Sequence, residues 1–437
     1  MLLIYVQKLT NRLGYTLNVV FRDILHIDFS MTTDRKTFEQ SDNPKLSYGE
    51  EPVGDELWLQ SSNLLFETVL HGQDLRYFEN DGMPAIFPVF NKRSIMNFDV
   101  FAATFYLVSR YEEYLPHHED IHGRYMAQES LAYKRGFLDK PIVDHWVLKL
   151  SEKLHEKYPA ECFVHRSFEF VETIDIDAAY CYLHKGAFRT ISGWLRDGIS
   201  RRDFPEMHRR WRVLRHKEQD PFDNFEYIIK LKSHFKQIKL IFFVLLGDYS
   251  MYDKPADYHN EHFRELLKHL ADYAKLGIHP SYKSMDEPEK INKEVQRLSD
   301  IIHRDIKRNR FHFLRFRIPN SYRDLSRYNI HEDFSMGYAD EIGFRAGTCS
   351  SFPYYDIPGD QETQLIIHPF CVMDTTLQRY KNMSPEEALE VYKQLINEIK
   401  SVDGTFCGIW HNQNLSELFG WQGWRDTYEK VLEYSTK

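Results

Sequence analysis

From about residue 165 to the end of the chain, segments with the alternation or the apolar run of a β-strand take turns with segments of helical period. The helix expected at 261–275, for instance, places Phe263, Leu267 and Leu270 on one side. Strand–helix units in a row indicate parallel strands with helices outside them, which is the α/β class, as a barrel or an open sheet. The expected strands are 168–177, 238–247, 277–280, 311–316, 332–338 and 405–410, and the other expected helices are 222–235, 291–302, 320–328 and 385–403.

Two of these helices carry a start signal. Ser284-Met285-Asp286-Glu287 has the form of a capping box for the helix at 291–302. Ser384-Pro385-Glu386-Glu387 combines an N-cap serine, a proline at the first helical position and the reciprocal glutamate. Gly404 ends the second of these helices.

The first part of the chain has a different pattern. Residues 17–25 alternate as a strand, 40–51 form a polar loop, and 98–115 and 146–158 have helical spacing. The aromatic tract 98–115 is typical of a seam between helices, with a ligand surface as the alternative. We expect a smaller α+β domain of unknown role at residues 1–164, followed by the α/β domain at 165–437.

Length and composition add bounds to this picture. A chain of 437 residues with a 42% hydrophobic and a 28% charged share is an ordinary globular protein of two domains. Its net charge of −9 argues against nucleic acid as the main partner. The segment 189–217 is nevertheless strongly basic and carries Trp194 and Trp211, so it is either a nucleic-acid patch or, as the net charge favours, a solvated insertion helix.

The compartment follows from the cysteines and the apolar runs. The five cysteines form no CxxC pair, and their odd count fits a reducing environment. The first residues do not have the pattern of a signal peptide, and the longest later apolar run, 240–247, is far short of a membrane span. We expect a cytoplasmic protein without a transmembrane segment.

Two aspartates at the end of the first α/β strand are the first candidate chemistry. Asp175 and Asp177 stand at i and i+2, which puts both carboxylates on one face of an extended chain. Two like charges held close together favour a cation between them or a shared proton. The plain alternative is that one caps the next helix while the other faces water.

Other polar residues stand at or near the remaining strand ends. A His/His/Asp set with one open position suits a hydrolytic zinc-type site, a further carboxylate can take a proton from water, and a late histidine can protonate a leaving group. For His312 the alternative is a core histidine. The residues at these positions are Asp175, Asp177, His279, His312, Asp333, Arg345, Asp374 and His411.

The order of these residues resembles the polysaccharide deacetylases of the NodB-homology group. Thr173-Ile174-Asp175-Ile176-Asp177 is similar to their first motif, although Ile176 separates the two aspartates, and Trp410-His411-Asn412 is similar to their last. His279-Pro280-Ser281-Tyr282 is similar to the second motif, but Lys283 stands where that motif has another histidine. The whole chain resembles, more closely, a branch of uncharacterised Bacteroides-type proteins that have an extra N-terminal domain.

The resemblance implies a fold and a set of roles. After residue 165 it implies a deformed (β/α) barrel of about seven strands. Asp175 would be the base and His411 the acid, with a divalent metal (zinc first, then cobalt, manganese or nickel) held by Asp177, His279 and, as the replacement ligand, His312. Beside the resemblance, Arg310, Asp333, Arg345 and Asp374 are expected to bind substrate or support the site. Arg345, flanked by Gly343 and Gly347, would orient the base or hold an anionic sugar group, with a structural salt bridge as the alternative. Asp374 would hold His411 in its working tautomer, with a helix cap as the alternative.

The expected function is therefore a metal-dependent hydrolase that removes an acyl group, N- or O-acetyl, from a carbohydrate or a glycolipid precursor. Lys283 leaves open an inactive carbohydrate-binding or assembly protein on the same barrel. A glycosidase that uses Asp175 with another acid is a third, weaker reading.

Overall fold

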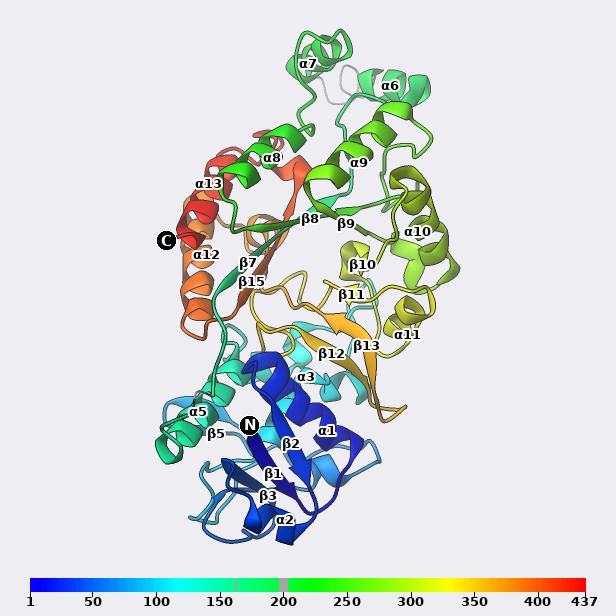
Figure 1. The fold of residues 1–437 in the computed structure, drawn as a ribbon. Helices are drawn as coiled ribbons and strands as arrows, with labels where there is room; N and C mark the ends of the chain where they lie inside the picture. The colour runs from blue at the N-terminus through cyan, green and yellow to red at the C-terminus, as the bar shows by residue number, and fades with distance from the viewer. Residues whose placement is uncertain (162, 196–202) are drawn as a thin grey trace.

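The chain forms two main parallel sheets that share a continuous apolar core (Figure 1). The computed structural model describes residues 1–161, 163–195 and 203–437. The N-terminal sheet has the strand order β2-β1-β3-β4, with β1 Leu2–Val6, β2 Phe29–Thr32, β3 Lys45–Gly49 and β4 Leu57–Gln60, all parallel. Around it lie α1 Asn11–Leu17, α2 Arg35–Gln40, α3 Val100–Val108, α4 Leu131–Lys134, α5 Ile142–Lys157 and the hairpin of β5 Phe78–Asn80 with β6 Met83–Ala85.

Two expectations for this part were wrong. Residues 17–25 are not a strand: α1 continues through a wider helical turn over Asn18–Ile24. The apolar residues Leu13, Leu17, Val20 and Ile24 keep a helical spacing, and Thr10 caps the helix by accepting the Leu13 N–H, so the β-branched pair in the middle does not decide the conformation. Within the expected loop 40–51, β3 pairs with β1 and β4 and buries Leu46 and Tyr48.

The second sheet has nine strands in the order β12-β13-β11-β10-β9-β8-β7-β15-β14. Neighbouring strands are parallel except for the antiparallel pair β12 and β13. This confirms the α/β class with parallel strands; closure into a barrel stays a prediction. The bounds are β7 Glu169–Ile176, β8 Lys239–Val244, β9 Lys275–Ile278, β10 Arg308–Asn309, β11 Glu332–Asp333, β12 Phe352–Asp356, β13 Gln361–Ile367, β14 Val372–Met373 and β15 Thr405–His411.

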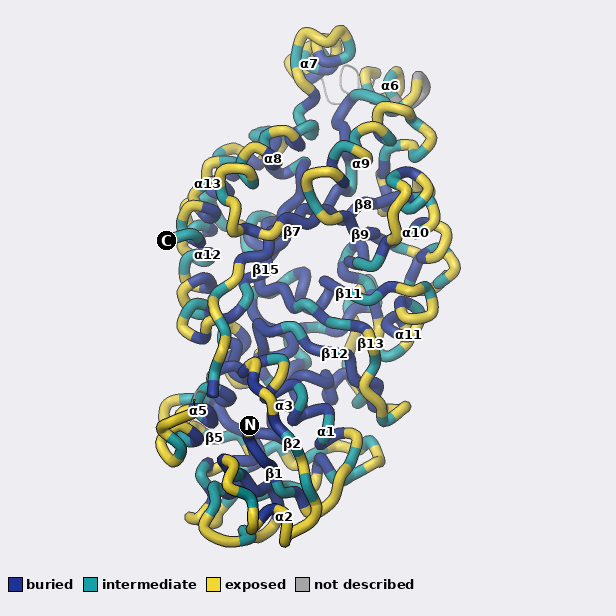
Figure 2. The backbone as a smooth tube through the Cα atoms, in the orientation of Figure 1, coloured by how far each residue is buried: buried dark blue, intermediate teal, exposed yellow. Residues whose placement is uncertain are grey.

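Helices surround these strands on the outside (Figure 1). They are α8 Phe225–His234, α9 Glu261–Tyr273, α10 Glu289–Ile302, α11 Asn320–Arg327, α12 Pro385–Lys400 and α13 Trp424–Ser435. The opposite face of the sheet has a small apolar cluster of its own, with Val171, Phe243 and Ile409 among its members. Because side chains alternate along a strand, the residues that follow this cluster at the strand ends point to the same enclosed side. Figure 2 shows the strands as the most deeply buried part of the chain.

Several predicted element bounds change. The strand expected at 311–316 ends at Asn309, and His312–Leu314 form a tight 3-10 turn in which Phe313 and Leu314 both have positive φ (59° and 52°). The strand expected at 332–338 ends at Asp333, and the antiparallel pair of β12 and β13 was not expected. Sequence alternation did not reveal these ends because they depend on pairing with distant strands.

The two capping boxes have different outcomes. The Ser384 hydroxyl accepts the Glu387 N–H while the Glu387 carboxylate accepts the Ser384 N–H, so the box at the start of α12 is confirmed. The box at Ser284 was wrong: this buried serine lies in a 3-10 turn, and α10 begins at Glu289, directly after Pro288. A proline disfavours helical backbone in the residue before it, so a helix that started near residue 285 could not run through it.

The basic segment 189–217 forms two helices, α6 Gly186–Leu195 and α7 Phe204–Leu214. Its middle part, 196–202, lies outside the described residues. Figure 1 shows both helices projecting from one end of the molecule.

The two sheets are tied together by packing and by buried charge. Tyr15 and Phe105 both pack against the ring of Tyr355 in β12, at 4.8 and 5.3 Å between ring centroids. The buried Asp144 accepts hydrogen bonds from Arg166, Thr348 and Ser350. The apolar core is continuous from one sheet to the other, and the domain boundary at 164/165 stays a prediction.

Candidate active site

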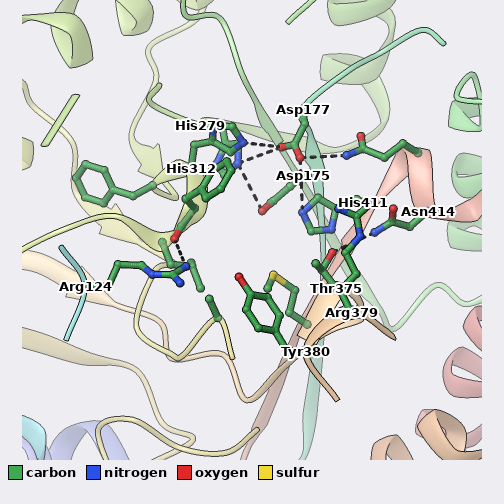
Figure 3. Close-up of a pocket in the computed structure, with 16 residues that line it drawn as sticks. Arg124, Asp175, Asp177, His279, His312, Thr375, Arg379, Tyr380, His411 and Asn414 are labelled. Atoms are coloured by element: carbon green, nitrogen blue, oxygen red, sulfur yellow. Dashed lines mark hydrogen bonds and ion pairs between the residues drawn. The ribbon is translucent and has the colours of Figure 1, made fainter. Parts of the chain in front are cut away.

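Five of the predicted site residues line one pocket at the carboxyl ends of neighbouring strands (Figure 3). Asp175 lies in β7 and Asp177 directly after it, while His279 and His312 follow β9 and β10. His411 ends β15 and is paired in register with Asp175. These strands are parallel and adjacent or nearly adjacent in the sheet, so their ends meet at one edge and bring together residues that are up to 236 positions apart.

Three of these side chains converge on one point. The Nε2 atoms of His279 and His312 lie 3.3 and 3.7 Å from Oδ1 of Asp177. The two imidazole rings stand 4.9 Å apart between centroids. In the part of the chain that the structure describes, this is the one group of His, Cys, Asp or Glu side chains with the spacing of a metal site.

Hydrogen bonds on the far side of each ring fix its tautomer. His279 Nδ1 lies 2.6 Å from the backbone oxygen of Arg310, and His312 Nδ1 lies 2.9 Å from Oδ1 of Asp253. A carbonyl or carboxylate oxygen can only accept, so each Nδ1 carries a proton and each Nε2 is the ring nitrogen left to face the pocket. Neutral imidazoles with a free Nε2 and a bonded Nδ1 are the form in which histidine binds a metal.

The donor set fits a divalent metal. Ligand atoms about 2.1 Å from a tetrahedral ion stand about 3.4 Å apart, which is close to the two separations from Asp177. Asp177 Oδ1 is buried and has no hydrogen-bond partner among the described residues, while its Oδ2 accepts the Gln413 amide at 3.0 Å. An unsatisfied buried carboxylate oxygen is costly unless a cation or a proton occupies the space in front of it.

The charge of Asp177 is stabilised by its neighbours. Burial opposes its ionisation, but His312, His279 and His411 together hold the pKa of the carboxyl well below its usual range. The pKa of His279 is raised, because the carboxylates of Asp175 and Asp177 outweigh the effect of burial. The pocket therefore concentrates negative charge where a cation would sit.

Asp175 lies beside this group and is held by an arginine. Its Oδ1 is 3.3 Å from Nη1 of Arg310, and its Oδ2 is 3.8 Å from Nε2 of His279. Arg310 is fully buried and also donates to the Thr173 hydroxyl and the Phe334 carbonyl, at 2.8 and 3.0 Å. Arg310 thus supports Asp175 from below the pocket and does not line it.

His411 stands on the other side of Asp177. Its Nδ1 donates to Oδ1 of Asp374 at 2.8 Å, and its Nε2 faces Asp177 Oδ2 at 3.8 Å. Asp374 is fully buried and also accepts from the Asn414 amide. Burial lowers the pKa of His411, but Asp374 and Asp177 outweigh it and raise the pKa to about 9. Asp374 therefore holds the histidine in place with its Nε2 directed into the pocket.

Two predicted supporting residues lie away from the pocket. Asp333 is fully buried and accepts from Asn309, Tyr322 and Ser335. Arg345 forms a two-point ion pair with Glu113, at 2.8 and 2.6 Å, which matches the salt-bridge alternative. Both side chains are satisfied by structural partners and have no contact with the five pocket residues.

Lys283, which replaces the expected second histidine, does not enter the site. Its side chain is 64% exposed and its ammonium is 4.0 Å from Glu287. His312 takes the open position from the next strand along the sheet. The turn at 312–314, with two residues in the left-handed region, directs its ring toward His279 and Asp177.

Sequence reasoning missed Asp253, Gln413 and Arg124. Asp253 precedes His312 by 59 positions in a segment without a recognisable motif, so only the fold reveals the pair. Arg124 comes from the N-terminal part and yet lines the pocket. It pairs with Asp120 at 2.6 Å and donates to the Phe313 carbonyl at 2.9 Å, in the turn that presents His312.

The N-terminal loop that carries Arg124 makes further contacts with residues at the rim of the pocket. His122 lies 2.9 Å from the Tyr282 hydroxyl and packs edge-on against the Tyr282 ring. Arg317 makes a two-point ion pair with Glu119, at 2.8 and 2.7 Å. One wall of the pocket is thus built from the N-terminal part of the chain.

Comparison with known proteins gives a limited match. Residues 2–159 match a family of unknown function, DUF7033. No curated protein matches the chain. Among solved structures, the chain is similar to a protein from Mycobacterium smegmatis assigned as a polysaccharide deacetylase, with 13% identity, a TM-score of 0.40 and coverage of 61% of this chain and 83% of the other. It is also similar to a polysaccharide deacetylase from Bacillus cereus, with 9% identity, a TM-score of 0.31 and coverage of 62% and 88%.

A membrane-spanning helix is not found: none of the helices in the described ranges is long and apolar enough to cross a bilayer.

Proposed function

We propose that this chain is a metal-dependent hydrolase that removes an acyl group, with acetyl as the first candidate, from a carbohydrate. One observation carries the proposal. Two histidines in the metal-binding tautomer converge with Asp177, between a carboxylate fixed by Arg310 and a histidine fixed by Asp374. The order of the motifs along the chain, similar to that of the NodB-homology deacetylases, supports the same reading.

Asp177, His279 and His312 would hold the ion, for which zinc is the first candidate and cobalt, manganese and nickel are alternatives. When bound, a divalent ion supplies Lewis acidity toward the acyl carbonyl and toward water. The two imidazole Nε2 atoms and the carboxylate of Asp177 are suitable donors for each of these metals.

Asp175 is the proposed general base. Arg310 bonds one of its oxygens, and the other lies at the edge of the pocket, 3.8 Å from His279 Nε2. There the carboxylate can accept the proton of the attacking water as the water oxygen bonds to the acyl carbon. The buried guanidinium orients the carboxylate for this step.

His411 is the proposed general acid. Its Nδ1 is bonded to Asp374, so its Nε2 proton is the one available to the pocket. With a pKa raised to about 9, the ring is protonated near neutral pH. It can then donate to the amine nitrogen or alkoxide oxygen that departs as the acyl carbon–heteroatom bond breaks. The products are a carboxylic acid and a sugar with a free amine or hydroxyl group.

Acetate release tests the reaction. The purified protein, loaded with each candidate metal, is incubated with a panel of N- and O-acetylated sugars and glycolipid precursors. We expect acetate without cleavage of glycosidic bonds. Glycosidic products would instead support the glycosidase reading, and sugar binding without either product would support a carbohydrate-binding protein.

Metal content tests the ligand set. Elemental analysis should show metal in the wild type and in His234→Ala, a control at an exposed position in α8. The Asp177→Ala, His279→Ala and His312→Ala variants should each lose it. Full metal occupancy in these three variants would overturn the assignment, whatever the activity.

A further inference from the structure

Two of the seven tryptophans are exposed, and both lie on the projecting helix pair α6 and α7 (Figure 1). Trp194 is 42% exposed and Trp211 is 40% exposed. The other five tryptophans are at most 2% exposed. Exposed tryptophan is thus confined to a single feature of the molecule.

Further large apolar side chains share the exposed faces of these helices. On α6, Ile191, Trp194 and Leu195 follow the i, i+3, i+4 spacing of one helix face and are 60%, 42% and 44% exposed. On α7, Phe204 and Trp211 are two turns apart and are 61% and 40% exposed. We call these five residues the apolar face of the insertion.

The side of α7 that packs against the protein carries Val213, which lies in a small apolar cluster with Cys181 and Tyr182, and two charged residues. Glu206 accepts a hydrogen bond from the Tyr182 hydroxyl, and the Arg210 guanidinium lies 4.7 Å from the centre of the same ring. Both charged residues are buried. A surface helix normally turns its apolar stripe toward the core and its charges toward water. In α7 two charged residues are buried beside Val213, while the large apolar side chains of Phe204 and Trp211 are exposed.

The two helices are also packed against each other. A Cβ at Gly193 in α6 would lie only 2.8 Å from Nη1 of Arg210 in α7, so the glycine permits a close approach of the helices. The two helices are therefore in contact, and the exposed apolar side chains come from both of them.

Basic residues lie beside Trp211 on this face. Between residues 203 and 217 the sequence has five Arg or Lys and two Asp or Glu, in a chain whose net charge is −9. The charges of Arg215 and Lys217 lie 5.7 and 5.0 Å from the ring centre of Trp211. Arg209 and Arg212 lie on the same helix and are partly balanced by Glu218.

Exposed Trp, Phe, Ile and Leu beside Arg and Lys match the interfacial zone of a membrane whose lipids are anionic. A nucleic acid would use the cations and the aromatic rings but has no use for Ile191 and Leu195. A second copy of the chain would bring one basic insertion against another. The charge and the aliphatic side chains together favour the lipid surface.

We propose that the α6–α7 pair docks this protein on an anionic lipid surface. The apolar face enters the headgroup region, and the basic side chains beside it bind the lipid phosphates. Gly186 follows Asp177 by nine residues, so the docked insertion would hold the pocket next to the membrane. Docking requires no catalysis, so it can be true or false independently of the acyl-transfer chemistry proposed above.

Vesicle binding tests the proposal. The full chain is mixed with vesicles of phosphatidylcholine alone or of equal parts phosphatidylcholine and phosphatidylglycerol, and bound protein is measured by flotation. We expect binding only to the anionic vesicles, weaker at high salt, with a blue shift of tryptophan fluorescence. Loss of one buried aromatic contact is expected to lower the partition coefficient at least about tenfold, so Trp194→Ser with Trp211→Ser should abolish binding and the blue shift.

Two further variants separate the contributions. Arg215→Glu with Lys217→Glu should abolish the preference for anionic lipid. Phe90→Ser removes a side chain that is 80% exposed in the N-terminal part and should leave vesicle binding unchanged. Circular dichroism and thermal unfolding confirm that each variant is folded.

Three results would overturn the proposal. The first is equal recovery of wild type and the tryptophan double variant with anionic vesicles. The second is binding of single-stranded RNA, but not of vesicles, that depends on the same residues. The third is concentration-dependent self-association that Trp194→Ser with Trp211→Ser removes, without vesicle binding by the wild type.

Discussion

Asp253 offers the sharpest test of how the metal site is built, because it touches the site only through His312. Its Oδ1 accepts the His312 Nδ1–H at 2.9 Å and the Tyr282 backbone N–H at 2.9 Å, and its Oδ2 accepts the Ser250 hydroxyl at 2.7 Å. Burial opposes its ionisation, but hydrogen bonds from His312 and Ser250 lower the pKa below its usual value. Asp253 is therefore an ionised carboxylate that fixes the tautomer of His312.

The proposed perturbation is Asp253→Asn, which keeps the shape and removes the charge. A hydrogen bond to a charged acceptor contributes about 1–2 kcal/mol more than a neutral one, so metal affinity should fall by about tenfold or more. Losses of about 10- to 100-fold are typical when such an outer partner is changed. If the amide nitrogen turns toward His312, the ring must carry its proton on Nε2, and the loss becomes larger.

The stability of the metal-free protein should change much less. The asparagine oxygen can still accept from His312 or Tyr282, and the amide can donate to the Ser250 oxygen, whose hydroxyl is free to rotate. We therefore expect a loss of at most about 2 kcal/mol in the free energy of unfolding.

The assay is a competition titration of zinc between the protein and a chromophoric chelator, together with urea unfolding of the metal-free protein. Asp248→Asn is the matched control, since Asp248 is 56% exposed, pairs with Arg297 and has no contact with a histidine. Zinc affinity that stays within about twofold of wild type in Asp253→Asn would refute the role assigned to this carboxylate.

Three further predictions follow from the structure. Asp175→Asn should lower the rate of acetate release by about 10²–10⁴-fold with metal content unchanged; metal loss in elemental analysis would make Asp175 a ligand instead. Glu113→Gln should lower the free energy of unfolding at neutral pH by about 3 kcal/mol, because Arg345 and Arg110 outweigh burial and lower the pKa of Glu113 to about 2. As the pH falls from about 4.5 toward 2, the difference in the free energy of unfolding between the wild type and Glu113→Gln, measured by chemical denaturation, should disappear. A difference that does not change with pH would contradict the stabilising role of the ion pair. Burial, and after it the charge of Asp374, raises the pKa of Glu172, so wild-type stability falls as the pH rises above about 4.5. Glu172→Gln should therefore unfold at a higher temperature than wild type at about pH 8 and show a smaller gain at about pH 5, and the reverse order would be inconsistent with a buried neutral acid.

Local patterns located much of the α/β part. The strands β7, β8 and β15 and the helices α9 and α12 lie close to the segments that periodicity predicted, because each must turn one apolar side to the core. The capping box at Ser384 was found for the same local reason. Predictions failed where pairing or proline chemistry overrode the local signal, as in the turn at 312–314 and before Pro288.

For the candidate site, too, the sequence predicted some residues and the tertiary structure decided others. The sequence by itself singled out the aspartate pair on β7 and the histidines at 279 and 411, since parallel strands present their carboxyl ends at one edge. It offered His312 only as a core histidine or a replacement ligand. The turn that directs its ring toward Asp177 and the carboxylate of Asp253 behind it appear only in the folded chain.

Sequence alone therefore determined the fold class, the order of the strand–helix units and the chemical types of the residues at the strand ends. Those features depend on side-chain spacing over a few residues, which can be read directly from the sequence. The tertiary structure decided that Arg345 pairs with Glu113, that Arg124 lines the pocket from the N-terminal part, and that Phe204 and Trp211 of α7 are exposed. These outcomes depend on which distant surfaces meet, and the free energy of such packing is not encoded in the pattern of any single segment.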